Sequence, residues 1–178
     1  FHGAVFLALA WASWKTYVSR SEIDGSRCSS MQGLGRALRE SSRPEEALPV
    51  LEANLALTRR YWSHVPEAIL IAQHNSALCL GDLERHDEAL VLKREIYARR
   101  VATLGVSHEE TIRIGYNVTL SMNQLGLWDE ARALARDQLL PAALTLGADH
   151  DLTLKLNQSL ANALRCNPER TRDDLLEA

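Results

Sequence analysis

The apolar residues in the middle of the chain follow a helical spacing. Between Glu67 and Leu83 they recur at helical rather than alternating intervals, at Ile69, Ala72, Ala77, Leu78 and Leu80. A polar break at residues 85–87 follows, and the helical pattern then resumes and runs to Leu104. Gly105 comes next, and glycine is a common residue just after the end of a helix. The pattern therefore predicts two helices joined by a tight turn.

This pair of helices recurs with a period of 42 residues. Glu-Ala dipeptides begin at Glu46, Glu88 and Glu130, inside the related strings RPEEAL, RHDEAL and LWDEAR. The strings LGVSHEET and LGADHDLT, which begin at Leu104 and Leu146, are also 42 residues apart. Self-similarity at a fixed period is typical of repeat architectures. The period predicts repeat 1 at 26–62, repeat 2 at 66–104, repeat 3 at 108–146 and a partial repeat 4 at 150–178.

The second helix of each repeat is expected to begin in the same way. Acidic residues fall in its first turn, where they complement the positive end of the helix dipole. An alanine follows at position 47, 89 or 131, and we expect it to lie where the two helices of a repeat approach closely. Pro44 stands at the first helical position, where its missing N–H has no consequence.

Both ends of the chain are expected to be partial repeats of a longer array. The apolar stretch at residues 3–14 is shorter than the ~20 residues that cross a bilayer, and no basic segment precedes it. Val5 falls one period before Ala47, so residues 1–20 are predicted to be the second helix of an earlier repeat. The hydrophobic region of a signal peptide is the alternative. Asn167 and Pro168 predict the start of a last helix that reaches Ala178.

Composition narrows the classes of function. The 178 residues carry a net charge of -3 and are 46% hydrophobic, which predicts one soluble globular array and gives no indication of nucleic-acid or membrane binding. Three widely spaced cysteines, Cys28, Cys79 and Cys166, form no Cys-x-x-Cys pair. We expect them to be reduced, which suits a cytoplasmic protein.

The repeat resembles a known family. Paired helices with Glu-Ala in the second one resemble tetratricopeptide repeats (TPRs), and the 42-residue length with Leu-Gly-x-x-His-x-x-Thr resembles the kinesin light chain-like type. The chain departs from that pattern at its first junction, YWSHVPEA, and at Ser159, which replaces an asparagine. Glu109 and Asp151 stand where the family usually has proline. The resemblance implies an all-α solenoid of αα-hairpins, coiled into a right-handed superhelix.

The same resemblance implies a ligand surface on the first helix of each repeat, which lines the concave face in such arrays. Carried over to this chain, the implied peptide-binding residues are Arg36, Arg39, His74, Asn75, Arg113, Tyr116, Asn117, Asn123, Lys155, Gln158, Asn162 and Arg165. Asparagine side chains can pair with the backbone of an extended peptide, and arginine forks bind carboxylates. We therefore expect an acidic peptide as the partner. The alternative is that these charged residues only solvate the helix faces.

Catalysis, metal binding and cofactor binding are not expected. His108 and His150 recur with the repeat, which favours a structural role at a helix start over a catalytic one. The remaining histidines lack the spacing of helical zinc sites, and no phosphate-binding glycine loop is present. A non-enzymatic adaptor is the favoured function. A structural spacer, self-association through uncapped ends and a regulatory segment of a larger signalling enzyme remain open.

Overall fold

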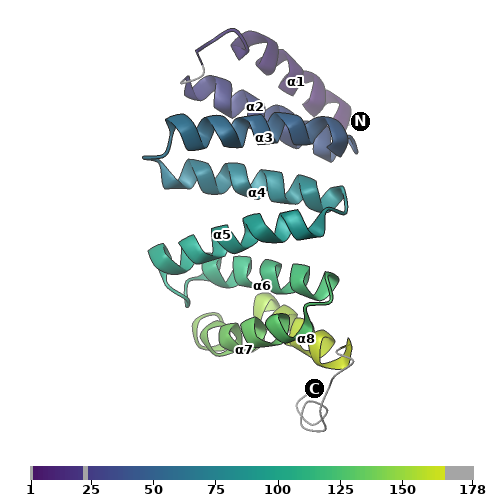
Figure 1. Cartoon of the computed structure of the whole chain (residues 1–178), viewed down its shortest axis with the longest axis vertical. Coiled ribbons are helices and arrows are strands. Elements are labelled where there is room, and N and C mark those ends of the chain that lie inside the picture. Colours follow the sequence, from purple (N-terminus) through teal and green to yellow (C-terminus); the bar gives the residue numbers. More distant parts are fainter. Residues whose placement is uncertain (1, 22–23, 167–178) are drawn as a thin grey trace. The chain divides into compact units, whose positions relative to one another are not determined.

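The computed structural model describes residues 2–21 and 24–166, and in that part of the chain every regular element is a helix. Figure 1 shows these helices following one another along the chain. Their bounds are α1 His2–Tyr17, α2 Gly25–Glu40, α3 Pro44–Tyr61, α4 Pro66–Asp82, α5 His86–Leu104, α6 Glu109–Gln124, α7 Trp128–Thr145 and α8 Asp151–Cys166. The expected last helix, at 167–178, lies outside the described residues.

The chain divides into two compact parts, called here the N-terminal half (Phe1–Leu92) and the C-terminal half (Lys93–Ala178), with the division inside α5. In the N-terminal half each helix from α1 to α4 packs against the next, and α2 also contacts α4. In the C-terminal half α6, α7 and α8 pack in the same order, and α6 also contacts α8. The first helices of successive repeats therefore lie next to each other within each half.

The turn inside each repeat has the same backbone conformation. Ser42, Glu84 and Gly126 are 42 residues apart, and all three have positive φ, at 58°, 59° and 73°. The residue that follows each of them donates its N–H to a carbonyl five residues back, over 2.9 to 3.0 Å. This is the Schellman arrangement, which satisfies the free carbonyls at a helix end. The period found in the sequence is thus also a period of the backbone.

The second helix of each repeat begins as the sequence predicts. Ala47, Ala89 and Ala131 are at most 1% exposed, which confirms that these positions lie at a close approach of helices. An ion pair precedes the first two of them: Arg43 pairs with Glu46 at 2.7 Å and Arg85 with Glu88 at 2.5 Å. Leu127 replaces the arginine in repeat 3, and Glu130 there pairs with Arg94 of α5 at 2.6 Å.

The core of the N-terminal half is formed by residues of α1, α2, α3 and α4 and of the start of α5. Leu34, Leu38 and Leu51 are each 1% exposed, and Phe6, Leu7 and Trp14 of α1 pack against the same cluster. Gly35 is needed at this contact, because a Cβ atom there would lie 2.4 Å from Cδ2 of Leu51. Hydrophobic side chains of the N-terminal stretch are thus partly buried against this cluster. No helix in the described ranges is long and apolar enough to cross a membrane.

Candidate peptide-binding surface

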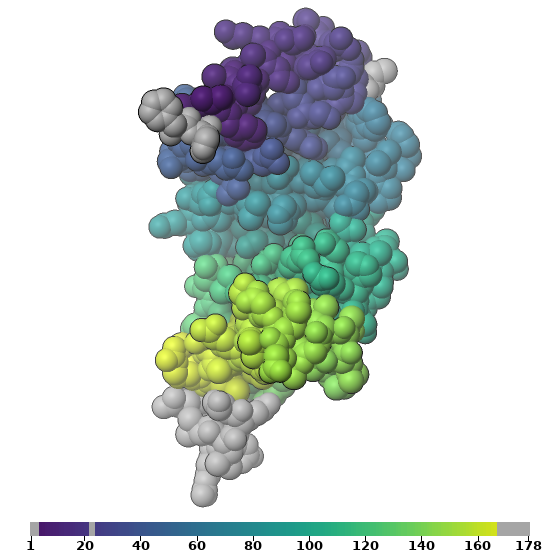
Figure 2. Space-filling model, turned by 180° about the vertical axis from the view of Figure 1, so that it is seen from behind, coloured from purple at the N-terminus to yellow at the C-terminus, as the bar shows by residue number. Residues whose placement is uncertain are grey.

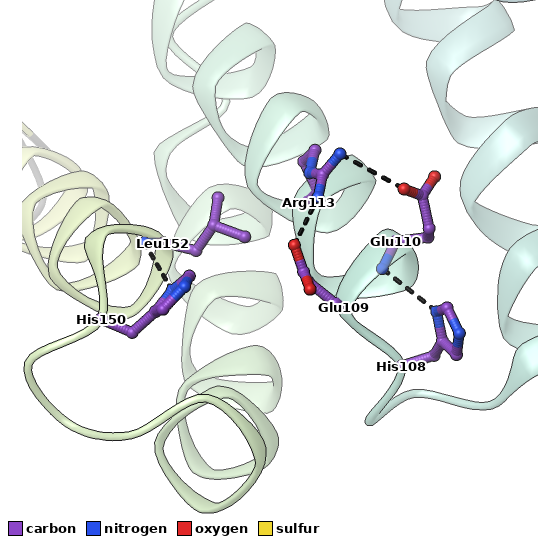
Figure 3. A network of polar contacts seen from close by, with 6 residues as sticks. All are labelled: His108, Glu109, Glu110, Arg113, His150 and Leu152. Carbon is purple, nitrogen blue, oxygen red and sulfur yellow. Dashed lines mark hydrogen bonds and ion pairs between the residues drawn. The ribbon is translucent and has the colours of Figure 1, made fainter.

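The two repeated histidines cap helices. Nδ1 of His108 accepts a hydrogen bond from the backbone N–H of Glu110 at 3.2 Å, and Nδ1 of His150 accepts one from Leu152 at 3.3 Å (Figure 3). These N–H groups belong to the first turns of α6 and α8. Backbone N–H groups in the first turn of a helix have no carbonyl partner within that helix. The prediction of a structural role at a helix start is confirmed for both residues.

Arg113, an implied peptide contact, is held by its own helix. Its guanidinium pairs with Glu109 at 2.5 Å and with Glu110 at 3.3 Å, as Figure 3 shows. The Arg113 side chain is nevertheless 48% exposed, so its outer edge faces solvent. An acidic ligand would have to compete with two carboxylates for this guanidinium.

The other four implied cations also have polar partners. Arg36 lies 3.8 Å from Glu40, Arg39 lies 3.1 Å from Asp82, and Lys155 lies 2.7 Å from Asp151. The hydrogen bond that Lys155 donates to the Asp151 carboxylate raises the pKa of Lys155. Arg165 donates to Oδ1 of Asn162 at 3.2 Å. The positive charge expected on this surface is therefore largely balanced by neighbouring groups.

The implied amide and aromatic residues fall into two groups. Asn123 joins helices, because its Nδ2 donates to the carbonyl and to Oγ of Ser159, both at 2.9 Å. Tyr116 packs against a buried cluster in the C-terminal half. The second group reaches solvent: His74, Asn75, Asn117 and Asn162 are partly buried, and Gln158 is exposed. Among the described residues, Asn75, Asn117, Gln158 and Asn162 of this group can meet a ligand without first breaking a hydrogen bond that joins two helices.

A cleft between α1 and α2 was not anticipated from the sequence. It has a volume of about 510 Å³ and is lined by hydroxyl groups and small residues, among them Ser13, Tyr17, Ser26, Ser29 and Gly33. A Cβ atom at Gly33 would meet nothing within 4 Å, so this part of α2 borders open space. The sequence does not indicate this cleft, because its hydroxyl groups come from two different helices and meet only in the folded structure.

Lys93 is a second feature that the sequence reasoning missed. It lies on α5, the second helix of repeat 2, whereas the peptide-binding residues implied by the family resemblance all lie on first helices. Its Nζ donates to Oγ of Ser121 on α6 at 2.6 Å, and burial lowers the pKa of the ammonium. The sequence did contain an indication of Lys93, because the residues one period before and after it are apolar, Leu51 and Ala135. In the structure these two residues are 1% and 0% exposed.

The cysteines are all free thiols. Cys28 and Cys79 are buried, and burial raises the pKa of Cys79 to about 11. Its Sγ donates to the carbonyl of Pro44 at 3.3 Å, so this thiol is part of the packing and is not an activated nucleophile. No group of three potential metal-binding side chains was found among the described residues.

Comparison with known proteins identifies the fold. No family model and no curated protein matches the chain. Two crystal structures of nearly identical TPR-like repeats, described as from a kinesin light chain of Podosopora anserina, match 98% of this chain with a TM-score of 0.79. Their identities are 24% and 25%, over 81% and 82% of their own length. BtubC (BKLC) from P. vanneervenii matches 95% of this chain and 68% of its own, with a TM-score of 0.71 and 12% identity.

The chain thus has a TPR-like helical repeat fold. Its structural neighbours are repeats of the kinesin light chain-like type, as the sequence resemblance implies.

Proposed function

We propose that the chain is a non-enzymatic scaffold that binds an extended, acidic peptide along the first helices of its repeats. The TPR-like fold supports this proposal, because arrays of this kind present extended binding surfaces. The observation that carries it is the contact between successive first helices, α2 with α4 and α6 with α8, which creates a side-by-side pair in each half. Free thiols are the state maintained in the cytoplasm, where we propose that the protein acts.

The paired cations are compatible with an acidic ligand. Exposed ion pairs contribute little to stability, since solvent screens them and their side chains lose entropy on pairing. Within the described part of the chain, Arg113 and Lys155 are paired only with residues of their own helices, through exposed carboxylates. A ligand carboxylate can therefore replace Glu109 or Asp151 without disturbing the core.

Backbone recognition is assigned to the amide residues that reach solvent. Asn117 on α6 and Gln158 and Asn162 on α8 each carry a donor and an acceptor. An extended peptide presents both kinds of group and can pair with them in either sense. Asn123 is left out of this set, because its amide group already donates to Ser159.

Fluorescence anisotropy tests the proposal with three labelled peptides that alternate serine with glutamate, glutamine or lysine. We expect the glutamate peptide to bind most tightly and to weaken as salt is added. The double variant Arg113→Ala, Asn117→Ala should bind it less well while circular dichroism shows unchanged helicity. Equal binding of the glutamate and glutamine peptides would contradict the acidic preference. Unchanged binding by the double variant would refute this surface.

Self-association is the second candidate, and exposed apolar side chains favour it. Val5 and Leu9 of α1 are 56% and 65% exposed, and α1 lies at the surface in Figure 2 (dark purple). Leu140 and Leu144 of α7 are 66% and 78% exposed. Light scattering across a concentration series tests this candidate. A mass that stays at one chain at the highest concentration would exclude it, whereas a Leu144→Glu variant that restores the monomer would support it.

A further inference from the structure

Lys93 is a cation at a position where the repeat otherwise places a buried apolar side chain. Its equivalents Leu51 and Ala135 belong to the packing surface of their helices. At this position the ammonium is partly buried and reaches across to α6, where it binds Oγ of Ser121. The Ser121 hydroxyl in turn donates to the backbone carbonyl of Asn117 at 3.1 Å. Lys93 is therefore anchored one helical turn from Asn117.

Lys93 keeps unused hydrogen-bonding capacity. An ammonium group has three N–H donors, and one of them goes to Ser121. No other protein acceptor and no ion-pair partner of Lys93 occurs among residues 2–21 and 24–166, which sets it apart from Arg113 and Lys155. Loss of water is the cause of its lowered pKa, with no carboxylate to offset it.

A partly desolvated cation without a counter-ion favours an incoming anion. The water that Lys93 has lost is not replaced by a protein carboxylate, so a ligand carboxylate gains a charge-assisted hydrogen bond there without displacing one. At Arg113 the same ligand must first displace Glu109 or Glu110. A ligand carboxylate therefore has to displace a protein carboxylate at Arg113 but not at Lys93.

We propose that Lys93 is a carboxylate-binding group of the peptide surface and that it holds an acidic side chain of the ligand beside Asn117. This inference rests on the proposed function for the identity of its ligand. It assigns the main acidic contact to a second helix, α5, and not to the cations of the first helices.

Two measurements test it on the whole chain. The sequence contains three lysines, Lys15, Lys93 and Lys155, so protein labelled with 13C at lysine Cε gives three resolvable signals. On titration with sodium acetate, at constant ionic strength maintained with chloride, we expect the Lys93 signal to move more than that of Lys15. In anisotropy with the glutamate-serine peptide, Lys93→Met should weaken binding about tenfold, the loss typical of one charge-assisted hydrogen bond.

Lys15→Met is the matched control, since Lys15 is an exposed residue of α1 outside the proposed surface. Leu51 shows that an apolar side chain packs at the equivalent position, so Lys93→Met should fold, which circular dichroism checks. If the peptide binds both variants as well as the wild type, Lys93 is excluded while the proposed function stands. An acetate-dependent shift of Lys93 without any peptide binding would support the carboxylate site and reject the peptide scaffold. Equal acetate shifts at Lys93 and Lys15 would reject the site.

Discussion

Gly35 offers a direct test of how the helices of repeat 1 pack. A Cβ atom at this position would lie 2.4 Å from Cδ2 and 2.5 Å from Cγ of Leu51. Leu51 is 1% exposed and belongs to the core, so its side chain can move aside only by displacing other packed residues. We therefore expect Gly35→Ala to force α2 and α3 apart.

The size of the effect follows from two opposing terms. Overpacking of a filled core costs about 1–3 kcal/mol, and a contact well below 3 Å places this substitution at the upper end. Replacing glycine by alanine inside a helix returns about 1 kcal/mol through helix propensity. The net expectation for Gly35→Ala is a loss of about 2 kcal/mol in the free energy of unfolding.

Gly33 supplies a matched control in the same helix. A Cβ atom there meets nothing within 4 Å, so Gly33→Ala should gain the propensity term without a clash and stabilise by about 1 kcal/mol. Urea unfolding followed by circular dichroism measures both variants. In the double variant Gly35→Ala, Leu51→Ala the clash is removed, so the two losses should be clearly less than additive. Equal stabilisation by both glycine replacements, or strict additivity in the double variant, would refute the packing argument.

Two further predictions concern the turns and the caps. Glu84 has a φ of 59°, so Glu84→Gly should raise the free energy of unfolding by about 0.5–1 kcal/mol. Gly126 also has a positive φ, so Gly126→Ala should lower the free energy of unfolding by a similar amount and no more, since the new Cβ makes only an ordinary contact at 3.8 Å. A urea-unfolding midpoint that moves the same way in both variants would contradict this. His150→Ala should cost about 1 kcal/mol and His150→Asn much less, since asparagine can cap α8 in the same way; equal thermal midpoints for the two variants would exclude the capping role.

The helices could be predicted from the sequence because the features that define them recur. The Glu-Ala dipeptides, the Leu-Gly stops and the apolar spacing each appear at a period of 42 residues. The positive φ at the turn inside each repeat also recurs, yet among these three positions only Gly126 is a residue type that indicates it in the sequence. Ser42 and Glu84 adopt positive φ with ordinary side chains, since the tertiary contacts and the Schellman bonds outweigh the local cost. The backbone conformation at these turns is therefore repeated more faithfully than the amino-acid type at the same positions.

The balance of charge on the surface was only partly accessible from the sequence. Arg113 follows Glu109 by four residues, and Lys155 follows Asp151 in the same way, so these pairs could have been found from helical spacing. Arg39 pairs with Asp82, 43 residues away on the next first helix. Such a pair depends on how α2 lies against α4, which the period alone does not determine.

The repeat gives a physical criterion for separating structural residues from functional ones. A residue that lets the two helices of a repeat approach closely recurs in every repeat, as Ala47, Ala89 and Ala131 do, because each junction has the same geometry. Lys93 breaks that rule at a position where Leu51 packs well, and a half-buried ammonium is less favourable there than an apolar side chain. A costly residue that does not recur with the repeat, and whose single contact to a neighbouring helix in the described part of the chain leaves donors unused, is the kind that ligand binding explains.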